Sequence, residues 1–409
     1  MRRAAAIALL VGAGCDVPAA PAGTGGVDLE GGAADVRGFL VVGQPEDFRS
    51  TNVSVLDGDG ELLTATLAST ATLPLGGDVV LPSMPAPGAE AVLVDRGSPS
   101  SAPQLLFVDL ETAAARRLDV STGFWSNPRD YAQVAPDKAY VSRYNSNRGA
   151  GEQSHDMGAD LLVVDPRGPA VTGRIDLTPA LEGAPGGIES RPDRMAVLPG
   201  RVAVVLGMLP ATFEATTPSR LAFIDPTADE VTGFLDLAPL TGCTSLLSSP
   251  SGTRLVVLCL GRYSNSSGFT GEGAGMALVE IDPAPRVDRT IDARALGGGA
   301  PSFHGDFAAE DELLVVQFGS DEGESAVADR LVSIDLATTR SSELLRSGEL
   351  PYTLGGVSCA ARRGLCLVAD AGRGVVHRFR GVTGAGTPTV DTVQPDPRTG
   401  IPPRELGRL

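Results

Sequence analysis

A repeat of roughly fifty to sixty residues is the sequence feature that most constrains the fold. Its clearest copy runs from Leu161 to Leu177, LLVVDPRGPAVTGRIDL, and reads as a short apolar strand ending on Asp165, a turn and a second, alternating strand. The aspartates that close the first strand of six copies recur at intervals of 52 to 60 residues, and a seventh copy has Arg380 or its neighbour at this position. The copies begin at Val53, Leu105, Leu161, Leu221, Met276 and Leu331, and a seventh, GVVHRFRG, begins at Gly374.

Each repeat is predicted to contain four strands. In the third unit these are Tyr131–Val134, Ala139–Tyr144, Leu161–Val164 and Val171–Leu177, named a, b, c and d from the axis outward. One four-stranded unit leaves its faces bare, whereas seven units around an axis bury them. The 51 glycines and 31 prolines suit many short strands joined by turns. The sequence therefore predicts an all-β fold, a seven-bladed β-propeller of four-stranded antiparallel blades.

The predicted propeller spans residues 36–394 as one domain. PTVDTV, from Pro388, is the expected strand d of the seventh unit, and residues 395–409 are predicted to be an irregular C-terminal tail. Two ways of closing the ring remain open. Residues near Val27–Val36 supply the missing inner strand of the first unit, or the N-terminal segment completes the last one.

The stretch from Ala139 to Asn147, AYVSRYNSN, followed by LLVVDP and VTGRIDL, resembles the YVTN repeat of seven-bladed surface-layer and lactonase-like propellers. Tyr140 and Val141 match the first two letters of that motif, and Arg143 departs from the fourth. The resemblance covers about residues 38–393. It implies the fold, but the family mixes adhesins, binding proteins and a few enzymes, so it implies no single function.

The N-terminus has the features of an export signal. Residues 1–15, MRRAAAIALLVGAGC, contain two arginines, a short apolar stretch and small residues before Cys15. The small residues resemble a bacterial lipobox, so Cys15 is the predicted lipidation site of an exported bacterial lipoprotein. Residues 16–35 read as a flexible tether. The expected location is the cell envelope, lipid-anchored on the periplasmic or outer surface.

The other four cysteines are predicted to form two disulfides, as an exported chain favours. Cys359 and Cys366 flank a turn at Arg362, and Cys243 and Cys259 flank the SPSG turn. Each pair would therefore face across an a-to-b hairpin. A metal site is the alternative, although neither spacing forms a metal knuckle, and no metal or other cofactor is predicted.

The net charge of −17 argues against nucleic-acid binding, because a phosphate backbone requires a basic surface. The content of aromatic residues is only 4 %, and there is no CxxCH motif, so neither a quinone nor a haem partner is supported. The expected partners are an envelope protein, a peptide or a glycan, besides the membrane, and the protein is expected to be a monomer.

The candidate site lies where residues enter strand a and where long b-to-c loops emerge, because both open on one face around the axis. The loops after the third and fifth strand b share an Arg-Tyr pair followed by polar residues. The candidate ligand- or partner-binding residues are Arg129, Arg143, Tyr144, Asn145, Arg191, Arg262, Tyr263, His304 and Tyr352. Trp125, Asn127, Asp193, Arg194 and Asp306 are expected on the same face. The alternative is that these loop residues serve turns and blade packing.

The recurring aspartates are predicted to be structural, because Asp before a turn accepts backbone N–H groups. His304 is the histidine of greatest interest, since it directly precedes strand a with Asp306 two residues on, whereas His377 is expected to be structural and His155 solvated. No acid–base pair stands at a recognisable spacing, so no catalytic residues are assigned. The leading hypothesis is a lipid-anchored binding or scaffold module. The alternative is a lactonase-like hydrolase with its site at the channel mouth, using His304, Arg191 and Arg129.

Overall fold

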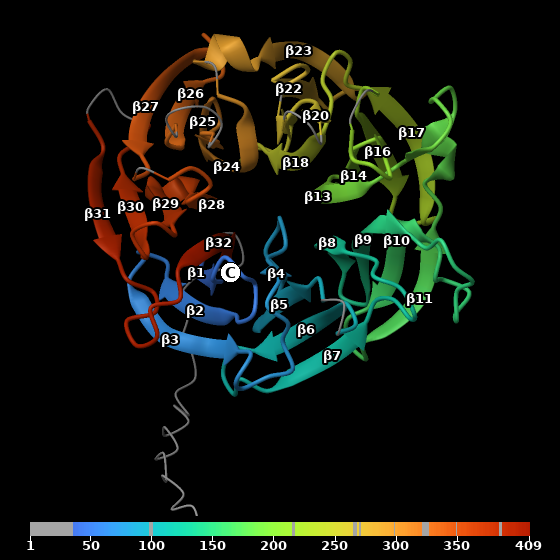
Figure 1. Cartoon of the computed structure of the whole chain (residues 1–409), viewed down its shortest axis with the longest axis horizontal. Helices are drawn as coiled ribbons and strands as arrows, with labels where there is room; N and C mark the ends of the chain where they lie inside the picture. Colours follow the sequence, from blue (N-terminus) through green and yellow to red (C-terminus); the bar gives the residue numbers. More distant parts are fainter. Residues whose placement is uncertain are drawn as a thin grey trace, which may run out of the picture.

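The computed structural model describes residues 36–409 except 98–100, 215–216, 265–267, 270, 298, 321–326, 349 and 384–386. Cys15, the export signal and the predicted tether lie outside the described residues. The described chain forms seven four-stranded antiparallel sheets, which surround a central axis as the blades of a propeller (Figure 1). The predicted all-β, seven-bladed architecture is confirmed.

Each blade runs outward from an inner strand a to an edge strand d. Blade 1 contains β32 (Pro403–Arg408), β1 (Gly38–Gly43), β2 (Asn52–Asp57) and β3 (Leu62–Ser69). Blade 2 contains β4 (Val79–Val80), β5 (Glu90–Asp95), β6 (Gln104–Asp109) and β7 (Ala115–Asp119). Blade 3 contains β8 (Pro128–Ala135), β9 (Lys138–Ser146), β10 (Gly158–Asp165) and β11 (Ala170–Ile175).

The remaining blades follow the same order. Blade 4 contains β13 (Pro192–Leu198), β14 (Arg201–Leu206), β16 (Arg220–Asp225) and β17 (Glu230–Asp236). Blade 5 contains β18 (Cys243–Ser248), β19 (Arg254–Cys259), β22 (Gly275–Glu280) and β23 (Arg286–Asp292). Blade 6 contains β24 (Pro301–Ala309), β25 (Glu312–Gln317), β26 (Arg330–Asp335) and β27 (Arg340–Arg346). Blade 7 contains β28 (Leu354–Ala360), β29 (Leu365–Asp370), β30 (Val375–Arg380) and β31 (Thr389–Val393).

Short elements decorate the connections. Two small ribbons pair β12 (Ile188–Glu189) with β15 (Leu209–Pro210) and β20 (Tyr263–Ser264) with β21 (Gly268–Phe269). Three 3-10 turns are η1 (Thr178–Leu181), η2 (Ala293–Leu296) and η3 (Ala361–Arg363). The b-to-c loops and the d-to-a connections all open on one side of the ring, which we call the mouth face.

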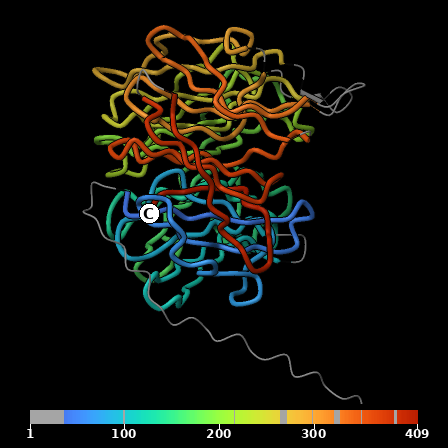
Figure 2. The backbone as a smooth tube through the Cα atoms, turned by 90° about the vertical axis from the view of Figure 1, so that its left-hand side faces the viewer, coloured from blue at the N-terminus to red at the C-terminus, as the bar shows by residue number. Residues whose placement is uncertain are grey.

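The C-terminal strand closes the ring. β32 pairs antiparallel with β1, with Leu40 opposite Gly407. Two backbone hydrogen bonds join the ends of the pair. Arg37 N–H donates to the Leu409 carbonyl at 3.0 Å, and Leu409 N–H donates to the Gly38 carbonyl at 2.8 Å. Both closures expected from the sequence are therefore wrong, and so is the prediction of an irregular tail over residues 395–409. Figure 2 shows the red C-terminal chain beside the blue N-terminal strands. The tail is strand-forming because β1 would otherwise present an unpaired inner edge.

The core is divided among the blade interfaces. Buried apolar side chains form seven principal clusters, each shared by two neighbouring blades, as Val205 of β14 and Val257 of β19 illustrate. Phe39 of β1 and Leu367 of β29 belong to the cluster that joins blade 7 to blade 1. Strands b and c are continuous apolar runs because neighbouring blades cover both of their faces. Outer strands alternate instead, as β17 does between exposed and half-buried residues.

The aspartates that end strand c cap the c-to-d turns. Asp109 accepts the N–H of Thr112 at 2.7 Å, Asp225 accepts that of Thr227 at 2.7 Å, and Asp335 accepts that of Ala337 at 2.8 Å. Hydrogen bonds of this kind lower the pKa of Asp109 and Asp335. In blade 5 the strand ends on Glu280 instead, and Asp282 follows in the turn. The structural role predicted for this position is confirmed.

Both disulfides are present. Cys243 pairs with Cys259 and Cys359 with Cys366, and in each case the two residues are directly opposite in the a-to-b register. No described helix is long and apolar enough to cross a membrane. The two disulfides are compatible with an oxidising compartment such as the periplasm or the cell exterior.

Candidate functional site

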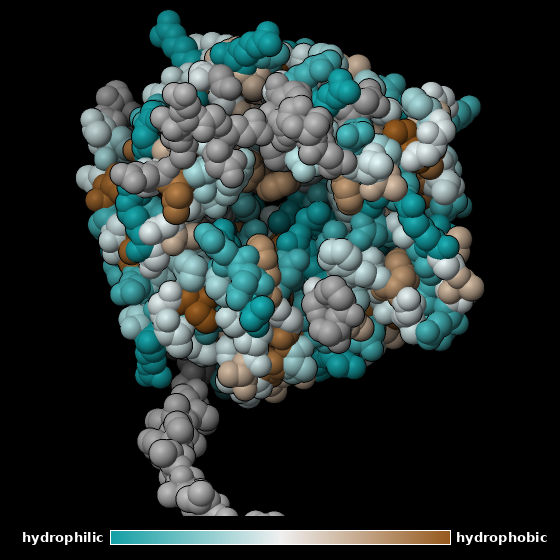
Figure 3. Space-filling view, viewed as in Figure 1, coloured by the Kyte–Doolittle hydropathy of each residue, from teal (hydrophilic) through white to brown (hydrophobic). Residues whose placement is uncertain are grey.

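The mouth face is hollowed at its centre, and hydrophilic residues line much of the hollow (Figure 3). The inner strands leave a channel cavity of about 90 Å³ there. Polar residues of six blades contribute to its wall. They include Ser83, Arg194, Ser245, His304, Asp306, Ser358 and Glu405. A polar, partly open channel of this kind can hold water or the polar end of a ligand.

His304 of β24 faces Glu405 of β32 in this channel. Nδ1 of His304 lies 3.9 Å from Oε2 of Glu405, and both side chains are mostly buried. Blade 7 stands between their strands, but there β28 carries Gly355 and Gly356. A Cβ on Gly356 would come within 2.3 Å of the Leu406 backbone nitrogen, so these glycines permit β32 to approach closely.

The environment keeps His304 neutral at physiological pH. Burial lowers its pKa below the ordinary value, and the Arg194 guanidinium also lowers it, whereas the Glu405 carboxylate opposes the shift. A neutral imidazole beside a carboxylate can accept a proton, which is what a general base must do.

Blades 2, 3 and 4 bring three arginines to the same opening. Arg96 follows β5 and donates through Nε to Asp78 at 2.9 Å. Arg194 of β13 reaches across to blade 2, where it donates to the Leu81 carbonyl at 2.7 Å, and it also donates to the Arg129 carbonyl at 3.2 Å. Arg129 of β8 lies with its Nε 4.0 Å from Oδ2 of Asp193.

Two buried aspartates accompany these arginines. Burial raises the pKa of Asp193, although Arg129, Arg194 and Arg96 all oppose the shift. Burial likewise raises the pKa of Asp130, which Arg194 opposes. Asp130 has a structural role, because it accepts the N–H groups of Ser83 at 2.8 Å and of Met195 at 2.7 Å and so joins blades 2, 3 and 4.

Asp306 has the equivalent role in blade 6. Its Oδ2 accepts the N–H of Cys359 in blade 7 at 2.8 Å, and its Oδ1 accepts the N–H of Phe307. The sequence placed Asp306 beside His304 as a potential partner. The structure gives it a bridging role between blades, and the carboxylate that faces His304 is Glu405.

Tyr144 is the centre of a stack of rings and guanidinium groups. The Arg129 guanidinium lies 4.5 Å from its ring centre and that of Arg191 lies 5.1 Å away. Phe213 is parallel to the Tyr144 ring at 6.3 Å. Arg191, held at a positive φ of 52°, also donates to Asn145 Oδ1 at 2.6 Å. The structure thus brings Arg129, Tyr144, Asn145 and Arg191 together, with cation–π contacts that stiffen the group.

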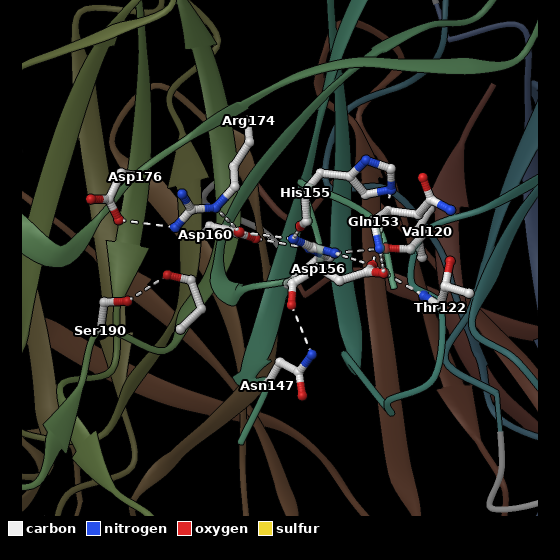
Figure 4. Close-up of polar contacts among 12 residues, drawn as sticks. Val120, Thr122, Asn147, Gln153, His155, Asp156, Asp160, Arg174, Asp176 and Ser190 are labelled. Atoms are coloured by element: carbon white, nitrogen blue, oxygen red, sulfur yellow. Dashed lines mark hydrogen bonds and ion pairs between the residues drawn. The ribbon is translucent and has the colours of Figure 1, made fainter. Parts of the chain in front are cut away.

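Arg143 belongs to the interior of blade 3. Its side chain is 0 % exposed, and it binds both oxygens of Asp160 at 2.8 Å. It also donates to the carbonyls of Val120 and His155. Figure 4 shows this network, in which Arg174 reaches Asp160 from one side while Asp156 faces Thr122 on the other. A side chain enclosed in this way cannot touch a partner, so the candidate role of Arg143 in ligand binding is wrong.

The matching Arg-Tyr pair of blade 5 has a different environment. The side chain of Arg262 is 45 % exposed and pairs with Glu272 of its own loop at 3.5 Å. Tyr263 belongs to the β20 ribbon in that loop. The two Arg-Tyr pairs look alike in sequence, but only the arginine of the first pair, Arg143, is buried against an aspartate, Asp160.

Tyr352 lies just before β28 and is 40 % exposed. It stacks edge-on against Phe318 at 5.3 Å, and Phe318 in turn contacts Phe303 at 5.8 Å. On the other side of the opening, Trp125 is 48 % exposed and donates through Nε1 to the Arg96 carbonyl at 2.6 Å. Asn127, also at the entry to β8, is buried.

Three residues of the site went unrecognised in the sequence. Glu405 stands in a segment that was expected to be irregular, and no local pattern marks it. Arg96 and Asp78 flank β5 and β4, whose signals are weak because β4 is only two residues long. Arg96 directly follows the last residue of the strand b of blade 2, at the start of a b-to-c loop, and that position was a usable signal.

The comparisons identify structural neighbours with the same fold. No protein-family model matches the chain, and no curated protein matches it significantly. The chain is similar to the periplasmic gluconolactonase of Pseudomonas aeruginosa, with a TM-score of 0.58, 13 % identity and coverage of 91 % of this chain and 98 % of that one. It is also similar to a candidate 6-phosphogluconolactonase of Bacteroides fragilis, with a TM-score of 0.57, 12 % identity and coverage of 93 % and 100 %. At such identities the likeness shows a shared propeller fold with lactonase-like neighbours.

Proposed function

We propose that this protein is an exported, lipid-anchored binding module whose mouth face engages a protein, peptide or glycan at the bacterial cell envelope. The observation that carries the proposal is the uneven placement of exposed apolar side chains. Eleven large hydrophobic side chains are exposed among the described residues, and eight of them lie on the mouth face. These eight are Phe48, Trp125, Met157, Phe213, Phe303, Val327, Leu350 and Tyr352.

The remaining three, Leu63, Phe234 and Val390, lie on the outer strands β3, β17 and β31. Five of the eight are aromatic, namely Phe48, Trp125, Phe213, Phe303 and Tyr352. Aromatic side chains with arginines beside them are the usual anchors of protein and carbohydrate recognition. Such a concentration on one face of a chain poor in aromatic residues supports a binding surface there.

A differential capture experiment tests the proposal. The mature protein would be immobilised and exposed to an envelope extract of the producing bacterium. A variant with Trp125→Ala and Tyr352→Ala should lose the captured partner, because it removes anchors on both sides of the opening. The matched control carries Phe234→Ala and Val390→Ala on the outer strands and should capture as the wild type does. Equal capture by both variants would refute the use of the mouth face.

The lipid anchor has its own measurement. Mass spectrometry of the protein recovered from membranes should show a diacylated N-terminal Cys15, and Cys15→Ser should release the protein into the soluble fraction. An unmodified Cys15 would contradict the predicted lipid anchor. This measurement does not bear on the mouth face.

A second candidate function is lactone or ester hydrolysis in the channel, which the pairing of His304 with Glu405 favours. His304 is a neutral imidazole that can act as base toward a water, and Arg194 is near enough to stabilise developing negative charge. Wild type, His304→Ala and Glu405→Gln would be assayed against a panel of lactones. A rate above background that His304→Ala removes supports hydrolysis, whereas equal rates in all three proteins exclude this candidate.

A further inference from the structure

We propose that the channel mouth contains a subsite for a ligand that carries a carboxylate next to a hydroxyl group, bound by the neighbouring side chains of Arg129 and Asp193. The inference rests on the proposed function, since it assigns a ligand chemistry to the same mouth face. Its basis is a pair of opposite charges that lie close together but are not hydrogen-bonded to each other.

Arg129 is the arginine of the group whose guanidinium is least engaged. Arg96 is held by Asp78, and Arg194 is held by two carbonyls. The Arg129 side chain has no hydrogen-bond acceptor among the described residues, and its buried Nε is unpaired. Its plane is nevertheless fixed, because it lies over the Tyr144 ring at 4.5 Å. A quarter of the Arg129 side chain is exposed, so a ligand can reach it from solvent.

Asp193 presents the complementary group. Its side chain is 6 % exposed, and its carboxylate accepts no hydrogen bond from the described residues. The nearest cationic atom, Nε of Arg129, is 4.0 Å away, which is too long for a hydrogen bond. A buried carboxylate without donors is costly, so a donor supplied by a ligand would be favourable here.

The two groups together specify a ligand. A guanidinium with unused N–H groups matches a carboxylate, whose two oxygens accept parallel bonds. Asp193 accepts only, so the neighbouring ligand group must donate, as a hydroxyl does. A hydroxy acid provides both groups within a few ångströms. The same pair of groups could come from a free acid or from a sugar acid within a glycan.

The experiment compares three probes that differ in one group each: L-lactate, propionate and lactamide. Propionate lacks the hydroxyl and lactamide lacks the charged carboxylate. NMR titration of the folded protein reports the weak binding expected of such small molecules. A second set of probes, glucuronate and methyl glucuronoside oligomers, is titrated in the same way. Comparison of their affinities shows whether the subsite prefers a free acid or a sugar acid within a glycan.

Lactate should bind more tightly than either of the other two probes. Arg129→Gln should weaken lactate binding by about ten- to a hundredfold, the loss expected for hydrogen bonds to a charged group. Asp193→Asn should lower the ratio of lactate to propionate affinity, because it removes the carboxylate that selects the hydroxyl, whereas the loss of its charge affects both acids equally and cancels in the ratio. Arg254→Gln, on the opposite face beside Asp311, is the matched control and should bind as the wild type does.

Equal affinities for lactate and propionate, or unchanged lactate binding in Arg129→Gln, would overturn the inference. Failure of the subsite is distinguishable from failure of the proposed function. The capture test uses Trp125 and Tyr352 and a macromolecular extract, whereas this test uses small probes and leaves those aromatic residues intact. Because the affinity ratio is measured within each variant, a small loss of stability in Asp193→Asn does not affect it.

Discussion

His304 and Glu405 face each other with 3.9 Å between Nδ1 and Oε2, although blade 7 separates their strands in the ring. The contact exists because the C-terminal strand returns to blade 1 and because β28 carries glycines where β32 passes. The only histidine at the channel thus has its acidic partner from the last few residues of the chain.

The pKa of His304 should respond in opposite directions to two substitutions. Glu405→Gln should lower it further, because the carboxylate is the charge that raises it, and Arg194→Gln should raise it, because the guanidinium is the charge that lowers it. NMR titration of the imidazole proton resonances in the wild type and both variants measures this directly. Shifts of the same sign in both variants would show that at least one of the two charges does not act on His304 as described.

The same lowered pKa has a consequence for stability. His304 binds a proton less readily in the folded protein than in the unfolded chain. The stability contributed by neutral His304 is therefore fully present above the pKa of histidine in the unfolded chain. It is lost as the pH falls below that value. His304→Gln should therefore reduce the dependence of the free energy of unfolding on pH between about 7 and 5, a window set by the ordinary histidine pKa of about 6.5. Denaturant unfolding at several pH values measures it. An unchanged slope would contradict the assignment.

Arg143→Leu should destabilise the protein by about 3 to 5 kcal/mol, because it leaves Asp160 and Asp156 buried without their main cation. Arg262→Leu, in the equivalent loop of blade 5, should change the free energy of unfolding by about 0.5 kcal/mol or less, since its ion pair is exposed. Urea unfolding of the two variants provides the comparison. Similar losses in both would mean that burial does not distinguish the two arginines.

A chain that stops after Pro402 should lose the inner strand of blade 1 and expose the edge of β1. We expect a lower melting temperature and association of the truncated chain, because an unpaired inner edge is a template for other strands. Calorimetry and size-exclusion chromatography would be compared with those of Glu405→Gln, which retains the strand. A truncated chain that melts like this control would show that β32 does not close the ring.

Replacing Cys243 and Cys259 by serine should lower the free energy of unfolding by about 2 to 3 kcal/mol, as expected for a cross-link that closes a loop of 16 residues. Reduction of the wild type should lower the free energy of unfolding further, because it also opens Cys359–Cys366, whose loop of 7 residues contributes about 2 kcal/mol by the same relation. A variant that is as stable as the oxidised wild type would contradict the prediction.

The sequence by itself determined the architecture and the local chemistry of the turns. A strand such as LLVVD, apolar on both faces, can be buried only between two layers, and the seven copies of the repeat, the last of them without the aspartate, specify seven blades. The disulfides also followed from the sequence, because cysteines that flank a hairpin turn symmetrically must face each other. These features depend on neighbours in the chain, which is why spacing alone predicts them.

Only the tertiary structure decided how the ring closes and which residues share the channel. Leu406 and Glu405 lie in a proline-rich tail without a strand pattern, and they form a strand because β1 offers an unpaired edge. Arg143 and Arg262 carry the same local motif, yet burial beside Asp160 makes the first structural and leaves the second exposed. Contacts between blades join residues that are distant in the chain, so their chemistry depends on closure of the ring rather than on any local signal.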